Sequence, residues 1–482
     1  MKTFFFYDLE TSGLDARRDR IMQFAGQRTD LDLKPVGEPV NLMVKLGDDV
    51  LPSPYAVIVT GITPQMTQAD GLKEVELARY LYEEVFTEGT CAVGYNNVRF
   101  DDEFMRCLFW RNFFDPYEWA WKDGRSRWDL LDVVRMTRAL RPDGIKWPVG
   151  KKVLENREEV EVATNKLELI TKLNGIGHAK AHDAMSDVEA LMDVARLVKE
   201  RQPELFGYLL KMRDKNEVKK LVNLDEKREF VYVSGRYEGE FEKATVAFPL
   251  TAGRNGNVVV WDLRHSCEGL VGMKRAELKK FLFEWKEKDE RDEKLPPRSV
   301  VKEMNYGRCP AVAPLGVLES GDGWERIGLS VGVVRENRKK LLAHPEFAEV
   351  VRELFEERGG EFESKGYAEE RLYDGFLGDG DRRKVEAVRN ASERELADFH
   401  PEFADERLPE LLLRYKGRNF PKTLSSDEMI AWETWREGQI RERLPGFAAE
   451  LEKLAGSVDG HEKQFLVQEL QLWCENVVGE DY

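Results

Sequence analysis

The chain has 482 residues, which at roughly 150 residues per domain predicts about three domains and excludes a single small module. Hydrophobic residues make up 42% of the sequence and aromatic residues 10%, which excludes a mainly disordered chain. Apolar runs stay short of the roughly 20 residues that a membrane-spanning helix needs, so we expect no membrane insertion. The net charge of −16 argues against a polyanion that coats the whole surface, so nucleic-acid binding requires locally concentrated basic residues.

The N-terminal segment and the cysteines indicate the compartment. Asp8 interrupts the apolar stretch where a signal peptide would need an apolar core, and no small-residue cleavage site follows it. The five cysteines are scattered and never form a Cys-x-x-Cys pair, so the sequence predicts neither a disulfide framework nor a thiolate zinc site. We therefore expect a cytoplasmic protein.

Residues 1–201 have the pattern of an α/β domain. β-Branched and aromatic residues separated by polar turns predict three successive strands, over 3–11, 21–29 and 39–46. Apolar residues at helical spacing then predict a helix over 72–86, followed by a buried strand over 91–95. Further helices are expected over 101–113, 130–140, 167–173 and 184–198. This alternation predicts a mixed sheet with flanking helices, which ends where Pro203 interrupts the helical pattern.

The rest of the chain predicts two further domains. Residues 202–355 have strand composition with glycine-rich turns, so we expect a small β-rich domain with appended helices; its strands are predicted over 230–233, 244–249 and 257–263. A charged, glycine-containing stretch marks the next boundary, and residues 356–482 predict a helical domain. Its helices are expected over 410–415, 426–443 and 460–478.

The first candidate site residues are a pair of carboxylates. Asp8 and Glu10 are two residues apart on a predicted strand, so both side chains leave the same face. Phe4 and Phe6 precede them and anchor that face in apolar surroundings. Such a pair can hold a divalent metal ion. Because 34% of the chain is charged, solvated charges at a strand end are the alternative.

Two later motifs add carboxylates at the same edge of the sheet. Asp101 follows the strand at 91–95 and opens a helix, which brings it near the first pair; the alternative is an acid that stabilises the helix N-terminus. His182 precedes Asp187 by five residues, and His178 and Asp183 have the same spacing. We prefer His182 and Asp187, because Asp187 lies inside the helix whose apolar stripe faces the sheet.

These residue types together suit phosphodiester hydrolysis. Two divalent ions clamped by the carboxylates would lower the pKa of a water and stabilise the leaving oxygen. Oxygen ligands favour Mg²⁺, with Mn²⁺ as a possible substitute, over zinc. A histidine that titrates near neutrality can act as general base. The predicted catalytic set is Asp8, Glu10, Asp101, His182 and Asp187, of which the four acids are the metal ligands.

The motifs Asp8-Leu9-Glu10-Thr11, Asn96-x-x-x-Phe100-Asp101 and His182-x-x-x-x-Asp187 resemble those of the DEDDh exonuclease superfamily. Longer strings are similar to the bacterial exonuclease I family; they cover residues 60–64, 94–103, 126–133, 139–142, 372–376 and 418–421. The resemblance implies an RNase H-like mixed sheet with flanking helices, then an SH3-like β-rich domain and an α-helical domain, arranged around single-stranded DNA. It also implies processive 3′ to 5′ digestion to 5′-mononucleotides in DNA repair and recombination. A monomer is implied as well, as is a partner, the single-strand DNA-binding protein, which docks through its acidic C-terminal tail.

The DNA path is expected where basic and aromatic residues interleave, between residues 106 and 128. Cations there can meet phosphates and rings can stack on bases, although core packing of the aromatics is the alternative. The resemblance implies DNA contacts by Glu10, Arg106, Tyr117, Trp121, Arg135 and Lys166. Gly61 could let backbone amides approach the terminal nucleotide, or form an ordinary turn. The basic residues of 211–220 and 414–422 could extend the cationic lining, or be solvated.

Two other functions compete with a single-strand DNA exonuclease. A shorter RNA-trimming or proofreading exonuclease is disfavoured by the roughly 280 residues that follow the nuclease domain. A non-catalytic single-strand-binding scaffold is disfavoured because all four acids and the histidine are present.

Overall fold

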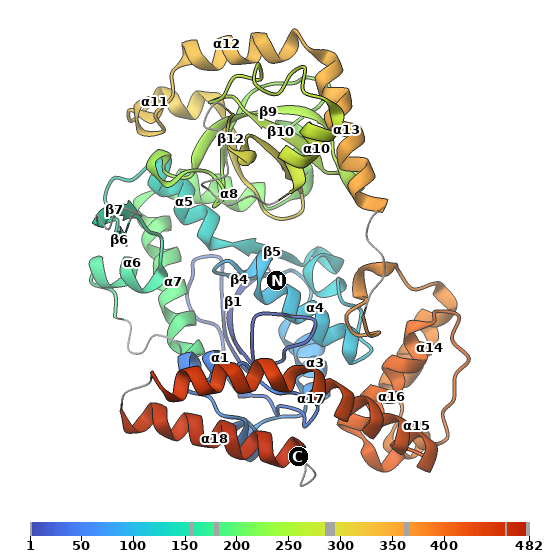
Figure 1. Cartoon of the computed structure of the whole chain (residues 1–482). Coiled ribbons are helices and arrows are strands. Elements are labelled where there is room, and N and C mark those ends of the chain that lie inside the picture. Colours follow the sequence, from blue (N-terminus) through green and yellow to red (C-terminus); the bar gives the residue numbers. More distant parts are fainter. Residues whose placement is uncertain are drawn as a thin grey trace. The chain divides into compact units, whose positions relative to one another are not determined.

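The structure is a computed structural model, and it describes residues 2–153, 159–177, 183–284, 295–360, 366–457 and 460–478 (Figure 1). The chain forms two compact units. The first unit comprises Met1–Arg127, His178–Met192 and Ser364–Tyr482. The second comprises Trp128–Gly177 and Asp193–Glu363. The expected domain limits at 201/202 and 355/356 stay a prediction.

A five-stranded mixed sheet with the strand order β3-β2-β1-β4-β5 carries the candidate site. The central strand β1 (Thr3–Thr11) pairs antiparallel with β2 (Ile21–Thr29) and parallel with β4 (Thr90–Gly94). The outer strands are β3 (Val40–Met43) and β5 (Ser126–Asp129). Aromatic residues on both faces of β1 are buried, because helices or loops cover both sides of this strand. The strands predicted at 3–11 and 21–29 are confirmed to the residue.

Short helices cover this sheet. Those that precede β5 are α1 (Pro54–Thr60), α2 (Pro64–Asp70), α3 (Glu74–Tyr80) and α4 (Asp101–Arg111), and a π-helical turn, η1 (Leu81–Val85), continues α3. The helix expected at 72–86 is therefore α3 with η1. Helices α1 and α2 were not predicted, although each begins with a proline after a capping residue. Ser53 and Thr63 accept hydrogen bonds from the first-turn amides of these helices.

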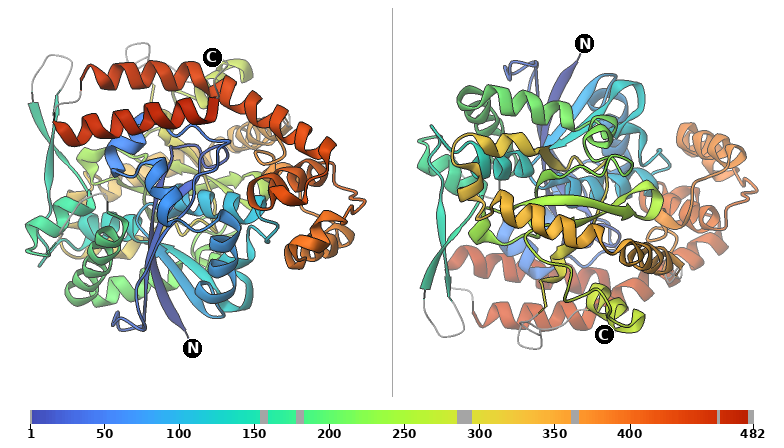
Figure 2. Two further views of the ribbon diagram at one scale, coloured as in Figure 1. Left: turned by 90° about the horizontal axis from the view of Figure 1, so that it is seen from below. Right: turned by 90° about the horizontal axis from the view of Figure 1, so that it is seen from above.

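The C-terminal segment adds helices to the same unit: α14 (Asp379–Asn390), α15 (Glu393–Ala397), α16 (Arg407–Asn419), α17 (Ser426–Ala455) and α18 (His461–Val478). Helices α17 and α18 lie side by side and pack on α1 (Figures 1 and 2). Their shared core includes Ile440, Phe447, Leu470 and Trp473, together with Val57 of α1. The predicted helical character of this segment is confirmed.

The second unit contains an antiparallel five-stranded sheet with the order β11-β10-β9-β8-β12. Its strands are β8 (Phe230–Val233), β9 (Ala244–Ala252), β10 (Val258–Asp262), β11 (Val301–Met304) and β12 (Ala311–Pro314). A hairpin is formed by β6 (Val149–Val153) and β7 (Glu159–Ala163). The helices are α5 (Leu130–Leu140), α6 (Leu167–Leu173), α8 (Pro203–Met212), α9 (Lys215–Leu221), α10 (Arg275–Phe283), α11 (Gly323–Arg326), α12 (Val331–Leu342) and α13 (Pro345–Gly360).

Helix α7 (Ala184–Arg201) begins in the first unit and continues into the second. The helices expected at 130–140 and 167–173 are confirmed to the residue as α5 and α6. Within the part of the chain that the structure describes, every helix is too short or too polar to cross a membrane.

Buried ion pairs fix the C-terminal segment to the sheet region of the first unit. The Arg418 guanidinium contacts Asp49 at 2.9 Å and Glu369 at 2.6 Å, and Arg20 contacts the same two acids at 3.4 and 3.1 Å. All four side chains are at most 8% exposed. Burial opposes ionisation of Glu369, but Arg418 and then Arg20 outweigh it and lower its pKa to about 2.

Three of the four basic residues of 414–422 differ from both expectations, whereas the fourth, Lys422, is exposed. Arg414, Lys416 and Arg418 neither line a DNA path nor lie in solvent, because they are buried and paired with acids. Lys416 contacts Glu428 at 2.8 Å. A charge buried in this way is stable only with its partner in place.

Glu369→Gln is expected to destabilise the protein by about 3 kcal/mol or more, because it leaves two buried guanidinium groups with one fewer counter-charge. Urea unfolding at neutral pH measures the change. Glu349→Gln is the control: its exposed pair with Arg352 should leave the unfolding free energy unchanged. Equal midpoints for the two variants would contradict a stabilising network.

Candidate active site

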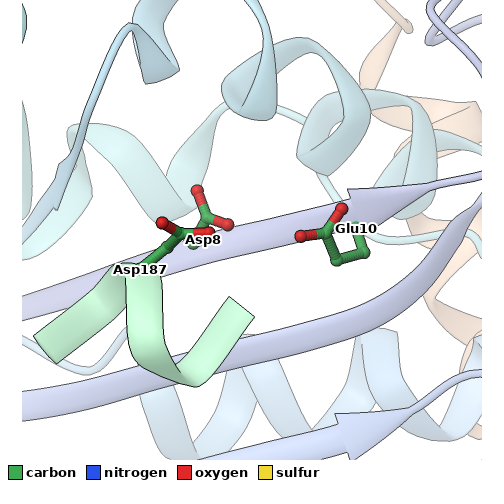
Figure 3. Close-up of side chains that lie close together, drawn as sticks. All are labelled: Asp8, Glu10 and Asp187. Atoms are coloured by element: carbon green, nitrogen blue, oxygen red, sulfur yellow. The ribbon is translucent and has the colours of Figure 1, made fainter. Parts of the chain in front are cut away.

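Three carboxylates lie together in the first unit, two from β1 and one from α7 (Figure 3). Asp8, Glu10 and Asp187 each offer one oxygen, and these atoms all lie within 4.8 Å of one another. The carboxylates of Asp8 and Asp187 lie next to each other, and Glu10 lies farther along β1 (Figure 3). The alternation of side chains along β1 explains why its two acids share a face.

The start of α7 determines which of its acids joins the cluster. Asp183 accepts hydrogen bonds from the Ser186 amide at 3.2 Å and the Ser186 hydroxyl at 2.9 Å, so it caps the helix. Asp187 lies in the first turn and faces β1. Of the two possible His-Asp registers, the structure therefore brings Asp187 to the cluster. His178 and His182 lie outside the described residues.

The fourth predicted acid is the first residue of α4. Asp101 is only 5% exposed, and its charge contributes to raising the pKa of Asp8. It therefore lies close enough to Asp8 for its charge to disfavour the ionised form of that carboxyl. Three of the four predicted acids, Asp8, Glu10 and Asp187, thus lie in one cluster. The role of all four acids, Asp101 included, as metal ligands stays a prediction.

Burial and mutual repulsion shape the electrostatics of this cluster. Burial raises the pKa of Asp8 well above its ordinary value, and Asp101, Asp187 and Glu10 raise it further. Burial also raises the pKa of Glu10 to about 7, with smaller contributions from Asp187 and Asp183. Carboxylates crowded in this way are unstable as bare anions. A divalent cation would relieve that repulsion, and three oxygen ligands within one coordination sphere fit Mg²⁺ or Mn²⁺.

Three of the predicted DNA-contact residues lie on or shortly after α4 in the first unit: Arg106 is on the helix, and Tyr117 and Trp121 follow it. The Arg106 guanidinium donates to Glu103 at 2.8 Å and to the Tyr373 hydroxyl at 3.2 Å, and it lies 5.6 Å from the ring centre of Tyr117. Trp121 is 65% exposed, which is unusual for so large an apolar side chain. Phe376, which was not predicted, is 81% exposed and packs edge-on against Tyr117. Phe376 belongs to the string at 372–376, so only the resemblance could have indicated it.

Most aromatic residues between 106 and 128 belong to the core, as the alternative interpretation expected. The buried ones are Phe109, Trp110, Phe113, Phe114, Trp119 and Trp128. Composition could not separate them from Trp121, because stacking platforms and core aromatics are the same residue types. Gly61 also follows the simpler interpretation: its φ of 72° is left-handed, and its amide donates to Val57 as the C-cap of α1.

Of the other predicted DNA contacts, Glu10 belongs to the carboxylate cluster on β1, and Arg135 and Lys166 lie in the second unit. Arg135 on α5 contacts Asp132 at 2.7 Å, and its side chain is 16% exposed. Lys166 precedes α6, and its side chain is 68% exposed and lies 3.6 Å from Glu168. In the 211–220 stretch, Lys211 and Lys220 both contact Glu217 and are exposed, as expected for a solvated face.

Comparison with known families matches three consecutive segments. Residues 5–195 match a family described as "Exonuclease", residues 213–357 the "Exonuclease I SH3-like domain", and residues 367–477 the "Exonuclease I C-terminal domain". The mixed sheet with its carboxylate cluster thus defines a nuclease of the RNase H-like class. The predicted fold, with an SH3-like β-rich part and a helical part, is confirmed.

The chain is 37% identical to the exodeoxyribonuclease I of Haemophilus influenzae and 38% identical to that of Escherichia coli. Both matches cover 99% of this chain, and 99% and 98% of the two relatives. The crystal structure of E. coli exonuclease I with a dA16 oligonucleotide has a TM-score of 0.93 at 36% identity, covering 99% of this chain and 100% of that one. The chain therefore belongs to the exonuclease I family, and it is an exonuclease.

Glu10→Gln is expected to stabilise the metal-free protein strongly at pH 8 and much less at pH 5. Folding raises the pKa of Glu10 from 4.5 to about 7, so its ionisation destabilises the folded state increasingly as pH rises through that interval. Thermal unfolding in EDTA across this pH range measures the effect. The wild-type melting temperature should fall more with pH than that of the variant. Parallel curves would contradict the raised pKa.

Proposed function

We propose that this protein hydrolyses single-stranded DNA processively from the 3′ end and releases 5′-mononucleotides. The observation that carries this proposal is the cluster of Asp8, Glu10 and Asp187 in a chain similar over its full length to exodeoxyribonuclease I. A solved relative with the same fold is in complex with a dA16 oligonucleotide. The full-length match also argues against a shorter RNA-trimming enzyme.

The four acids are proposed to hold two Mg²⁺ ions, with Mn²⁺ as a possible substitute. Asp8, Glu10 and Asp187 supply ligands at one position, and Asp101 supplies a further carboxylate beside Asp8. When bound, the two ions lower the pKa of the attacking water and stabilise the leaving oxygen. A zinc-bound form of the E. coli exonuclease I–single-stranded DNA complex is also known, with a TM-score of 0.92. Oxygen-only ligands favour the harder Mg²⁺ here.

The protein's own side chains are proposed to carry out the proton transfer, and its strands and helices position the acids. The acids bind a cation only as carboxylates, so the raised pKa values of Asp8 and Glu10 make cation binding compete with protonation of these two groups. His182 is proposed as the general base that takes a proton from the attacking water, because its spacing from Asp187 places it just before α7. Rigid elements, a central strand and two helix starts, hold the acids in position.

Single-stranded DNA is proposed to run along exposed rings and local cations. The exposed Trp121 ring and the partly buried Tyr117 are suited to stacking on bases without sequence preference. Arg106, Arg135 and Lys166 are proposed to meet phosphates. Glu10 is proposed to contact the terminal nucleotide as well as the metal. Local cations are necessary because the net charge of the chain is −16.

The family resemblance supports further proposals about the cellular role. We propose that the protein acts as a cytoplasmic monomer in DNA repair and recombination. Its proposed protein partner is the single-strand DNA-binding protein, through the acidic C-terminal tail of that partner.

Asp101→Ala is expected to lower Mg²⁺-dependent digestion at least about a hundredfold while single-strand binding is retained, because a metal ligand is lost and the DNA contacts remain. Digestion of 5′-labelled single-stranded, duplex and RNA oligomers, with and without Mg²⁺, also tests polarity, substrate and metal need. Asp379→Ala is a matched control: Asp379 is likewise the first residue of a helix, but its side chain is 94% exposed. Full activity of the Asp101 variant, or 5′ to 3′ shortening, would contradict the proposal.

Binding to single-stranded DNA is expected to weaken steeply with salt despite the net negative charge, because local cations release counterions from the strand. Fluorescence anisotropy of a labelled oligothymidylate, titrated with protein at about 50 to 200 mM NaCl, measures how the affinity changes with salt. Trp121→Ala should cost about 1–3 kcal/mol at every salt concentration, whereas Arg135→Ala should reduce the slope by about 0.7. A flat response of the wild-type protein would contradict the cationic path.

A further inference from the structure

A fully buried carboxylate is the sequence neighbour of Asp101, the fourth predicted metal ligand. Asp102 follows Asp101 on α4, and its exposed fraction is 0%. Its carboxylate accepts hydrogen bonds from the Tyr7 hydroxyl at 2.6 Å and the Asn97 side-chain amide at 3.1 Å. It also forms an ion pair with Arg127 on β5. Three donors thus compensate the burial of this charge.

The hydrogen bond from Tyr7 connects Asp102 on α4 to β1, the strand that carries Asp8 and Glu10. Tyr7 immediately precedes Asp8 on β1, just as Asp102 immediately follows Asp101 on α4. The parallel pairing of β1 with β4 runs from Thr3 to Phe6 on β1. Tyr7 is the next residue of β1. Its hydrogen bond to Asp102 therefore connects β1 to the segment that follows β4, just beyond the end of the strand pairing. One buried side-chain hydrogen bond therefore joins β1 to α4, and its two residues are the sequence neighbours of Asp8 and Asp101.

The turn after β4 is built so that Asn97 can reach Asp102. Asn96 has a left-handed backbone with φ of 68°. A Cβ atom at Gly94 would lie 2.5 Å from the Cβ of Asn97, which real Cβ atoms essentially never show. The glycine therefore lets the Asn97 side chain fold back over the strand end, where it is fully buried. The string from 94 to 103 thus encodes the support of Asp102 as well as the position of Asp101.

Arg127 completes the arrangement electrostatically. Its guanidinium is paired with Asp102, so the negative charge of Asp102 does not simply add to that of the four neighbouring acids. Arg127 lies in the basic and aromatic stretch between residues 106 and 128, but its guanidinium is paired with this buried acid.

We propose that Asp102 is a positioning residue of the metal site, which holds Asp8 and Asp101 at a fixed separation through its hydrogen bond with Tyr7. This inference rests on the proposed function, because it assigns Asp102 a role toward the metal ligands. Asp102 itself touches neither metal nor substrate.

Tyr7→Phe is the sharpest test, because it removes only the hydroxyl that donates to Asp102. The ring, which packs on Phe24 and Phe86, stays in place. Calorimetric titration of the metal-free protein with Mn²⁺ should show about 10- to 100-fold weaker binding, as for other groups that orient metal ligands. The Mg²⁺ concentration for half-maximal digestion should rise by a similar factor, and the KM for single-stranded DNA should stay unchanged. Asp102→Asn should have the same effect.

Tyr306→Phe is the matched control. It also removes a buried tyrosine hydroxyl, which donates to the Val222 carbonyl at 3.1 Å in the second unit, and it should leave Mn²⁺ binding unchanged. Mn²⁺ affinity of Tyr7→Phe within twofold of wild type would overturn the inference. If Asp102→Asn does not fold, Tyr7→Phe decides alone.

Asp8→Asn separates this inference from the proposed function. If Asp8→Asn loses Mn²⁺ binding while Tyr7→Phe keeps it, the metal site stands and the positioning role of Asp102 is wrong. If Asp8→Asn binds Mn²⁺ and digests DNA as the wild type does, the proposed metal site itself is wrong.

Discussion

Repulsion among carboxylates is the constraint that the sheet region has to overcome. Asp8, Glu10 and Asp187 hold their oxygens within 4.8 Å of one another, and Asp101 adds a further charge beside Asp8. Side chains on flexible loops would relax such crowding by moving apart. Here a central strand and the first turns of two helices carry them, so the crowding persists and a divalent cation becomes the natural way to relieve it. The tendency to bind metal is thus a property of the fold.

Many of the cationic side chains serve to neutralise buried acids. Many arginines, including Arg20, Arg111 and Arg418, are used inside the first unit, where they neutralise buried acids and attach the C-terminal segment to the sheet region. These paired arginines do not attract DNA, and the net charge of the chain is −16. The proposed binding of single-stranded DNA therefore depends on aromatic stacking as well as on charge. The contact of Arg106 with the Tyr117 ring, beside the exposed Phe376, combines both.

Local pattern was sufficient for the central strands and for α5 and α6, because their apolar periodicity and end signals agree with their tertiary environment. It was insufficient for α1 and α2, whose signal is a capping residue followed by proline at the first helical position rather than an apolar period. The acids could be predicted because motif and spacing specify them. Asp102 was not, since it lies beside Asp101 in sequence and only the contacts from Tyr7 and Asn97 reveal its role. The burial of Arg418 depends on Asp49, which is 369 residues away in the sequence, and no local pattern contains such a partner.

The central claim is that the acids of β1, α4 and α7 form one divalent-metal site. Anomalous diffraction from crystals grown with Mn²⁺ tests it most directly, because it locates the ions without reference to activity. The account predicts two anomalous peaks, both in contact with carboxylate oxygens of Asp8 and its neighbours Glu10, Asp101 and Asp187. Ordered crystals in which Mn²⁺ binds elsewhere, with these four acids turned apart, would contradict it.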